Sequence, residues 1–196
     1  MQTPAELLNV ELRRDGARPF ITAYDAEAGR VELSVATTAN WVAKVAGYLE
    51  DELGVGPGDQ IEVAPTLHWL TAVVLLAGWA VGAEVCFDPA AAAQQIEVPL
   101  DPMGAGLLRL VAAYPDRYVP ASPSGKAAAG DVPAGARLLT TLPLDGTGVG
   151  PGLLGPLAAG GSVVYVAAPE LAAKVAADER VTHTAGVDVA GLPRLG

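Results

Sequence analysis

Residues 31–88 read VELSVATTANWVAKVAGYLEDELGVGPGDQIEVAPTLHWLTAVVLLAGWAVGAEVCFD, and they predict a strand, a helix, a strand, a helix and a strand in that order. Apolar residues recur at helical spacing in the first half, at Val42, Val45, Ala46 and Leu49. Thr37 or Thr38 is expected to cap this helix, because a threonine hydroxyl accepts a hydrogen bond from a free N–H of the first turn. Gly54 is expected to end it.

The second half of this stretch turns at Gly56–Asp59 and continues with a strand at Gln60–Ala64. A helix from Thr66 to Val81 and a strand at Glu84–Phe87 follow. Strands that alternate with helices pair in parallel, because each crossover helix returns the chain to the same end of the sheet. We therefore expect an α/β fold with a mostly parallel sheet and helices on both faces.

The rest of the chain continues this pattern. A helix at 4–13 and a hairpin of strands 20–24 and 30–34 are expected near the start, and an Ala- and Pro-rich connection at 88–102 follows the central stretch. Beyond it we expect a helix at 103–113, a loop at 114–135, a second β-α-β unit at 137–166, a helix at 170–177 and a strand at 181–184. The two β-α-β units are expected side by side in one sheet. They would form a single α/β domain of residues 1–196, which can be subdivided into 1–100 and 101–196.

Several short motifs stand at scaffold positions of this pattern. They are Leu33-Ser34, LGVGPGD at 53–59, GAEV at 82–85, RLLTTLPLDGTGVGPGLLGPLAAGGSVVYV at 137–166 and ERVTHT at 179–184. In this order they resemble the N-terminal portion of the adenylate-forming (AMP-binding) superfamily, which includes acyl-CoA synthetases, luciferases and peptide-synthetase adenylation domains. The resemblance implies the α/β scaffold of acyl-CoA synthetases and, in that family, acid–CoA ligase activity.

The resemblance also implies a phosphate loop between the two matching regions, rich in Ser, Thr and Gly and ending in Pro-Lys-Gly. Its consecutive backbone N–H groups and its lysine would neutralise a triphosphate. Residues 121–130 read ASPSGKAAAG, in which only Ser124-Gly125-Lys126 is similar. This fragment lacks the threonines, the second glycine and the following proline and lysine. We therefore expect an exposed loop without phosphate binding.

The motifs that the family places farther along have no counterpart before Gly196. In the family they bind adenine, magnesium and ribose, and they include the catalytic lysine of a hinged C-terminal domain. A chain without these groups cannot stabilise the charge that develops in adenylyl transfer. We expect a degenerate, truncated relative without adenylation activity and without a cofactor, with no catalytic residue of its own.

Such a relative would serve as a ligand-binding or protein-interaction module. The alternative is a residual enzyme, or an acyl-, CoA- or AMP-binding protein that uses a crevice near Asp145 and His183. A larger scaffold that loses a lobe exposes the apolar surface against which the lobe packed. We therefore also expect a homo-oligomer or a protein partner.

Candidate ligand-binding residues follow from the rule that ligands of open parallel sheets collect at the carboxyl ends of the strands. Asp145 ends one predicted strand, Gly146 and Gly148 follow it, and His183 lies at the predicted carboxyl end of the last strand. The resembled family commonly carries histidine after an aromatic residue where this chain has Asp145 and Gly146. Asp145 and His183 could form a general-base pair or a structural hydrogen bond.

The segment Gly150–Gly155, GPGLLG, formally satisfies the dinucleotide fingerprint, and Glu170 stands where a ribose-binding carboxylate would lie. However, Pro143–Val149 separates these glycines from their strand, and Pro151 removes an N–H that a pyrophosphate would use. A glycine-rich connection fitted to close packing is the main interpretation. A nicotinamide or flavin site is the alternative.

The composition is that of an acidic globular protein, with 196 residues, 51% hydrophobic and 17% charged, and a formal charge of −10. An acidic chain gains nothing from counterion release, so neither nucleic acid nor an anionic membrane is expected as a partner. A single cysteine, Cys86, fits a reducing cytoplasm. Two histidines are too few for a histidine-based metal cluster, so no metal site is expected, and His68 is expected to cap a helix.

The run from Val63 to Ala83 carries no formal charge and has the length of a membrane span. Pro65 and His68 interrupt it, and Glu62 and Glu84 flank it where a spanning helix would show Lys or Arg on one side. A buried strand followed by a buried helix is the expected structure. The N-terminus lacks the basic start and apolar run of a secretion signal, so no targeting segment is expected.

Overall fold

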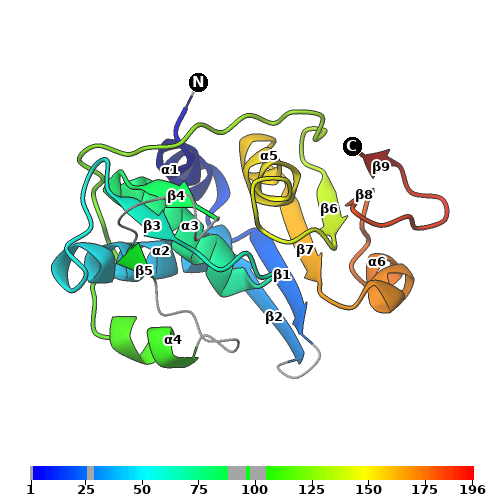
Figure 1. The fold of residues 1–196 in the computed structure, drawn as a ribbon. Coiled ribbons are helices and arrows are strands. Elements are labelled where there is room, and N and C mark those ends of the chain that lie inside the picture. Colours follow the sequence, from blue (N-terminus) through cyan, green and yellow to red (C-terminus); the bar gives the residue numbers. More distant parts are fainter. Residues whose placement is uncertain (1, 26–28, 88–95, 98–104) are drawn as a thin grey trace.

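The computed structural model describes residues 2–25, 29–87, 96–97 and 105–196. In this part of the chain, a six-stranded sheet has the order β2-β1-β7-β6-β8-β9 and a three-stranded sheet has the order β4-β3-β5 (Figure 1). The elements in chain order are α1 (Pro4–Asp15), β1 (Pro19–Asp25), β2 (Gly29–Ser34), α2 (Val35–Asp51), β3 (Gln60–Glu62), α3 (Trp69–Val81), β4 (Glu84–Cys86), β5 (Ile96–Glu97), α4 (Ala105–Val111), β6 (Arg137–Thr140), η1 (Gly150–Leu154), α5 (Gly155–Ala158), β7 (Ser162–Val166), η2 (Pro169–Leu171), α6 (Ala172–Asp178), β8 (His183–Ala185) and β9 (Arg194–Leu195).

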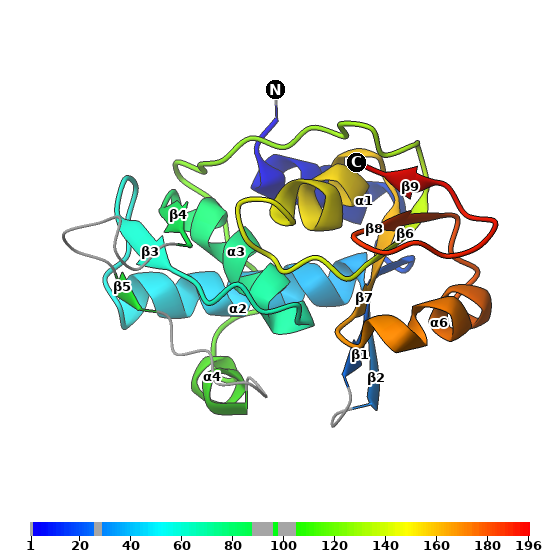
Figure 2. The same cartoon turned by 45° about the vertical axis from the view of Figure 1, so that its right-hand side comes forward.

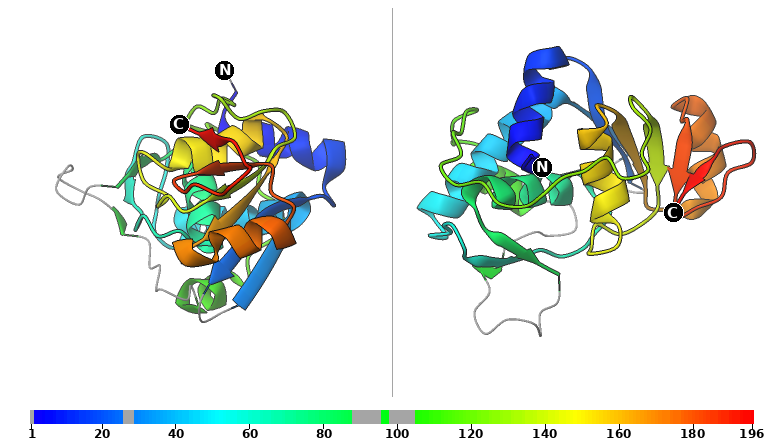
Figure 3. Two further views of the ribbon diagram at one scale, coloured as in Figure 1. Left: turned by 90° about the vertical axis from the view of Figure 1, so that its right-hand side faces the viewer. Right: turned by 90° about the horizontal axis from the view of Figure 1, so that it is seen from above.

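The larger sheet confirms the predicted fold class. β1 and β2 form the predicted antiparallel hairpin, and the other described pairings of this sheet are parallel. Successive side chains of a strand alternate between the faces. Accordingly, Val163 and Tyr165 of β7 lie in the core with α1, α2, α3 and α5, while Val164 and Val166 pack against α6. Helices thus cover both faces, with α5 and α6 on opposite sides of the strands (Figure 3).

The expectation that both β-α-β units share one sheet is wrong. β3 pairs with β4 and β5 in the smaller sheet, whereas β2 forms an edge of the larger one. Helices α2 and α3 lie between the two sheets (Figure 2). All 13 residues of α3 are buried, so this helix needs apolar partners on every side and not only on one stripe. Ile61 of β3 covers it at Gly78, where an added Cβ would lie 2.4 Å from Ile61 Cδ1.

Most of the uncharged run at Val63–Ala83 is buried, as predicted, but residues 64–66 are exposed. β3 ends at Glu62 instead of Ala64, and α3 begins at Trp69 instead of Thr66, because His68 occupies the cap position. Ile61 and Val63 are buried at the end of β3, and α3 follows after a short turn. Within the described ranges, no helix combines the length and the apolar character that crossing a bilayer requires.

The N-terminal cap of α3 is the predicted one, and that of α2 is not. His68 caps α3, because its Nδ1 accepts a hydrogen bond from the Leu70 N–H at 3.1 Å. The predicted Thr37 or Thr38 cap of α2 is wrong. Ser34 is the cap, and its hydroxyl accepts from the Thr37 N–H at 3.1 Å, while the buried Thr38 hydroxyl donates to the Ser34 carbonyl at 2.9 Å. The reason is that β2 passes directly into α2, so the last strand residue occupies the cap position.

The last strands differ from their predicted positions. β8 begins at His183, two residues after the predicted start, because Thr182 is engaged with the backbone of Arg137 before the ladder begins. The two-residue strands β5 and β9 were not predicted, since such short segments carry no periodic pattern. The predicted helix at 103–113 appears as α4, and its predicted start and most of the predicted connection at 88–102 lie outside the described residues.

Thr184 of β8 is fully buried, and its hydroxyl is the one buried side-chain N or O atom of the described residues without a hydrogen-bond partner. Thr184→Val removes a polar group whose desolvation is not compensated and keeps the shape of the side chain. We expect the free energy of unfolding to rise by about 1 kcal/mol in urea denaturation. Thr140→Val is the matched control. Thr140 is equally buried, but its hydroxyl accepts from the Leu142 N–H at 3.1 Å, so that variant should lose stability. No gain from Thr184→Val would contradict the prediction.

Candidate functional site

The predicted ligand-binding residues Asp145, Gly146 and Gly148 lie together in the loop after β6. β6 ends at Thr140, so Asp145 stands five residues beyond the strand and not at its end as predicted. Its Oδ1 accepts hydrogen bonds from the Thr147 N–H at 2.8 Å, the Thr147 hydroxyl at 2.7 Å and the Gly148 N–H at 3.0 Å. These bonds, the Thr147 hydroxyl first, lower the pKa of Asp145 below its ordinary value. The carboxylate therefore folds the loop through one oxygen.

The two glycines of this turn have different surroundings. Gly146 is exposed, and a Cβ added there would meet nothing within 4 Å. Gly148 is buried, and its Cβ would lie 1.9 Å from the Pro143 carbonyl oxygen. The Gly148 carbonyl accepts from the Gly152 N–H at 2.7 Å, which joins the turn to η1. Gly148 is thus closely packed within the turn, whereas Gly146 is open to solvent.

The segment Gly150–Gly155 forms η1 and the start of α5, and Glu170 lies in η2 after β7. Residues 141–149 separate this glycine segment from the end of β6, so the turn does not follow its strand as a dinucleotide site requires. Pro151 stands in the first turn without an N–H. The geometry therefore favours the packing interpretation over a nicotinamide or flavin site.

His183 lies apart from the turn. It pairs with Leu138 in the sheet register and begins β8, so its predicted position at the carboxyl end of the strand is wrong. Its Nδ1 lies 2.9 Å from the Thr182 hydroxyl. Asp145 follows the opposite end of β6. The structure thus gathers Asp145, Gly146 and Gly148 and does not bring His183 to them, which removes the geometric basis for an Asp145–His183 general-base pair.

The fragment that resembles a phosphate loop is tied into the fold. The Ser124 N–H donates to the Trp79 carbonyl at 2.8 Å, and the Ser124 hydroxyl donates to the Ala83 carbonyl at 2.6 Å. A Cβ added to Gly125 would lie 2.9 Å from the indole of Trp79. The fragment is therefore a loop, as predicted, and it packs on the C-terminal end of α3 while Lys126 is exposed.

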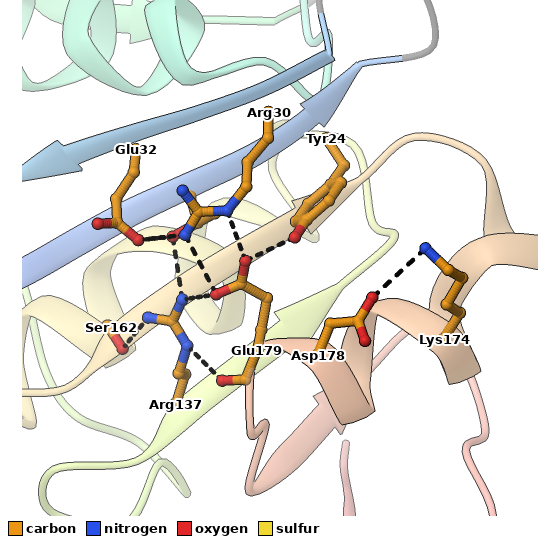
Figure 4. A network of polar contacts seen from close by, with 9 residues as sticks. Tyr24, Arg30, Glu32, Arg137, Ser162, Lys174, Asp178 and Glu179 are labelled. Atoms are coloured by element: carbon orange, nitrogen blue, oxygen red, sulfur yellow. Dashed lines mark hydrogen bonds and ion pairs between the residues drawn. The ribbon is translucent and has the colours of Figure 1, made fainter.

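A charged network around Glu179 was missed by sequence reasoning (Figure 4). The Glu179 carboxylate accepts from Arg30 Nε at 2.7 Å, from the Tyr24 hydroxyl at 2.6 Å and from Arg137 Nη2. Burial opposes ionisation of Glu179, but these hydrogen bonds outweigh it and lower the pKa to about 2. Arg137 also donates to the Ser162 hydroxyl at 3.2 Å. These charged and polar side chains are hydrogen-bonded to one another, and they come from β1, β2, β6, β7 and the end of α6. The network, called the Glu179 clamp below, therefore holds these elements together.

A groove of about 550 Å³ lies between α1, α2 and residues 116–120. Its volume falls within the range of small-molecule sites. None of the predicted site residues lines it. Sequence reasoning missed it because its lining comes from four segments that are distant in sequence: α1, α2, Ala80 of α3 and residues 116–120. Among the described residues, no cluster of three or more His, Cys, Asp or Glu side chains could hold a metal ion.

The comparisons with known proteins agree with this architecture. A curated protein of Mycobacterium tuberculosis (strain ATCC 25618 / H37Rv), described as a TIGR03089 family protein, is 43% identical over 93 residues, which are 45% of this chain and 38% of that protein. No family model matches the chain. The N-terminal domain of FACL13 from Mycobacterium tuberculosis superposes with a TM-score of 0.74 at 12% identity, over 95% of this chain and 63% of that chain. A Mycobacterium tuberculosis fatty acyl CoA synthetase gives a TM-score of 0.74 at 12% identity, over 93% of this chain and 49% of that chain.

The fold is that of the N-terminal part of acyl-CoA synthetases. The resemblance seen in the sequence motifs is thereby confirmed for the architecture of the chain. The chain spans less than two thirds of the length of these relatives. In this chain the turn of Asp145, Gly146 and Gly148 follows strand β6, and Ser124 of the 121–130 segment is bonded to the C-terminal end of α3.

Proposed function

We propose that this chain is a ligand-binding or protein-interaction module with an acyl-CoA synthetase-like fold and without adenylation activity of its own. The observation that carries the proposal is the engagement of Ser124 by the Trp79 and Ala83 carbonyls. A phosphate loop must direct its free N–H and hydroxyl donors at the phosphates. Here the N–H and the hydroxyl of Ser124 already have partners inside the protein. The segment contains a single lysine, Lys126, and no threonine.

Isothermal titration with ATP and magnesium tests this proposal, together with an assay of pyrophosphate exchange. We expect no saturable heat and no exchange. The Lys126→Ala variant should behave like the wild type in both measurements, since this exposed lysine would have no phosphate to hold. Micromolar binding that Lys126→Ala abolishes, or exchange above the buffer rate, would contradict the proposal.

A second candidate function is binding of an acyl, CoA or AMP ligand at the turn of Asp145, Gly146 and Gly148. It is favoured by the open space at Gly146 and by the second oxygen of Asp145, which carries none of the three bonds that fold the turn. Thermal-shift measurements with AMP, CoA and acyl-CoA esters test it. A ligand at a hundred times its dissociation constant should stabilise the chain by about 2.7 kcal/mol. Binding that Gly146→Trp leaves unchanged would exclude this turn as the site.

The proposal includes a cytoplasmic location and a homo-oligomer or protein partner. The single half-buried Cys86 suits a reducing compartment. Leu110 and Leu171 are exposed apolar side chains that a partner could cover. Sedimentation at increasing concentration tests the homo-oligomer, and an unchanged monomer would count against it.

A further inference from the structure

The groove between α1 and α2 has an apolar floor. Leu8 of α1, Val42 and Ala43 of α2 and Ala80 of α3 line it and are buried. Its rim carries an apolar side chain with 87% exposure, that of Val119. Exposed apolar surface continuous with a buried apolar floor is the usual composition of a binding groove, in which a few polar groups fix the orientation of the ligand.

The outer wall of the groove is held in place on α2. Lys44 Nζ forms an ion pair with Asp116 Oδ1 at 2.8 Å and also donates to the Ala112 and Tyr114 carbonyls. The Tyr118 hydroxyl donates to Glu50 at 2.6 Å. These bonds anchor the wall to α2 at Asp116 and Tyr118. The groove is therefore formed before any ligand arrives, which reduces the entropic cost of binding.

The charges of the groove favour an anion. Asp116 is neutralised by Lys44, whereas Arg117 lines the groove and makes no ion pair or hydrogen bond within the described part of the chain. The exposed amides of Asn9 and Asn40 flank the same space. An unpaired guanidinium beside an apolar floor complements a molecule with an apolar chain and one anionic head group.

We propose that this groove binds a small single-chain amphiphile with an anionic head group, whose chain lies over Leu8 and Val42 and whose head group meets Arg117. A protein partner is less well supported, because a stable interface requires about 800 Å² from each side and the exposed large apolar side chains at the groove are Leu12 and Val119. None of the residues of the Asp145 turn or of the 121–130 loop lines the groove. Binding in the groove therefore requires neither of those segments.

The test is a nuclear magnetic resonance titration of the whole chain with octanesulfonate below its micelle concentration, with 1-octanol and octyltrimethylammonium as neutral and cationic probes. We expect saturable shifts of backbone amides in α1, α2 and residues 116–120. Octanesulfonate should bind about fivefold more tightly than 1-octanol, the size of effect that one partly exposed charge contact gives. The cationic probe should bind more weakly than 1-octanol.

Two variants and one control decide the roles of charge and shape. Arg117→Glu should abolish the preference for octanesulfonate and leave binding of 1-octanol unchanged. Arg109→Glu, an equal charge reversal at an exposed position of α4 outside the groove, should keep the preference. Ala39→Trp should block all three probes, because the indole would fill the groove.

Absent or non-saturable binding, shifts that map elsewhere, or equal affinity for the three probes would overturn the proposal. The shifts in the wild type locate the site even if Ala39→Trp fails to fold. Self-association in sedimentation that octanesulfonate does not reverse and Ala39→Trp abolishes would assign the groove to a second copy of the chain instead.

Discussion

The Glu179→Ala variant is expected to unfold with a free energy about 3 kcal/mol below that of the wild type in urea denaturation. Removal of the Glu179 carboxylate leaves the guanidinium of Arg137, which is only 18% exposed, without its counter-ion. Loss of one partner of a buried ion pair costs about 3 to 5 kcal/mol. The lower end applies because Arg137 keeps its bonds to the Ser162 hydroxyl and to the backbone carbonyl of residue 179.

The neighbouring pair provides a matched control. Asp178 and Lys174 form an ion pair at 3.4 Å between exposed side chains of α6, beside the network (Figure 4). Asp178→Ala removes a carboxylate from the position that directly precedes Glu179. It should change the free energy of unfolding by less than about 0.5 kcal/mol. Equal effects of the two variants would show that the Glu179 network does not stabilise the fold.

The pH dependence of stability gives an independent check on Glu179. Its pKa is lowered to about 2 in the folded chain, below the usual value of about 4.3 for an unfolded glutamate. A lowered pKa means that the carboxylate stabilises the fold above the unfolded value, and this stabilisation is lost as the pH falls to the folded value. The stability difference between the wild type and Glu179→Gln should therefore shrink between about pH 4.5 and pH 2. A difference that is constant over this range would refute an ionised Glu179.

Gly148→Ala is expected to lower the free energy of unfolding by about 3 kcal/mol, at the upper end of the cost of overpacking. The new Cβ would lie 1.9 Å from the Pro143 carbonyl oxygen. The backbone fixes the position of a Cβ, and the oxygen is itself a backbone atom, so no side-chain rotation relieves the contact. The loop must open to accommodate it. That movement would also weaken the bond from the Gly148 N–H to Asp145, so the pKa of Asp145 should rise towards its ordinary value in a carbon-detected titration.

Gly146→Ala is the control for this loop, because a Cβ there meets nothing within 4 Å. Its effect on the free energy of unfolding should stay within about 0.5 kcal/mol. If Gly146→Ala and Gly148→Ala were equally stable, the close approach at Pro143 would not be a constraint of the fold.

Much of the architecture was predictable because it rests on local signals. The amphipathic spacing of α2 and the uncharged, largely apolar sequence of α3 identified both helices, and the Gly56–Asp59 turn identified the boundary between them. The parallel β6-β7 unit was also predicted, since the alternation of strand and helix is written along the chain.

The candidate site was predicted only in part, for a physical reason. Asp145, Gly146 and Gly148 are neighbours in sequence, so a turn that joins them could be inferred. The position of His183 depends on the register of β8 against β6, which is fixed by bonds between Thr182 and Arg137. β8 begins two residues later than predicted. Such a change leaves the alternation of side chains between the two faces unaltered, so the hydrophobic pattern does not detect it.

The amino-acid sequence by itself determined the helices, the hairpin, the parallel β6-β7 unit and the absence of a phosphate-loop motif between residues 88 and 137. Only the tertiary structure decided the division into two sheets, the Glu179 clamp and the groove beside Arg117. The spacing of apolar residues along a single segment shows which side of that helix or strand is apolar. Which distant element covers that side, and which distant charge meets a buried carboxylate, depends on contacts that no single segment contains.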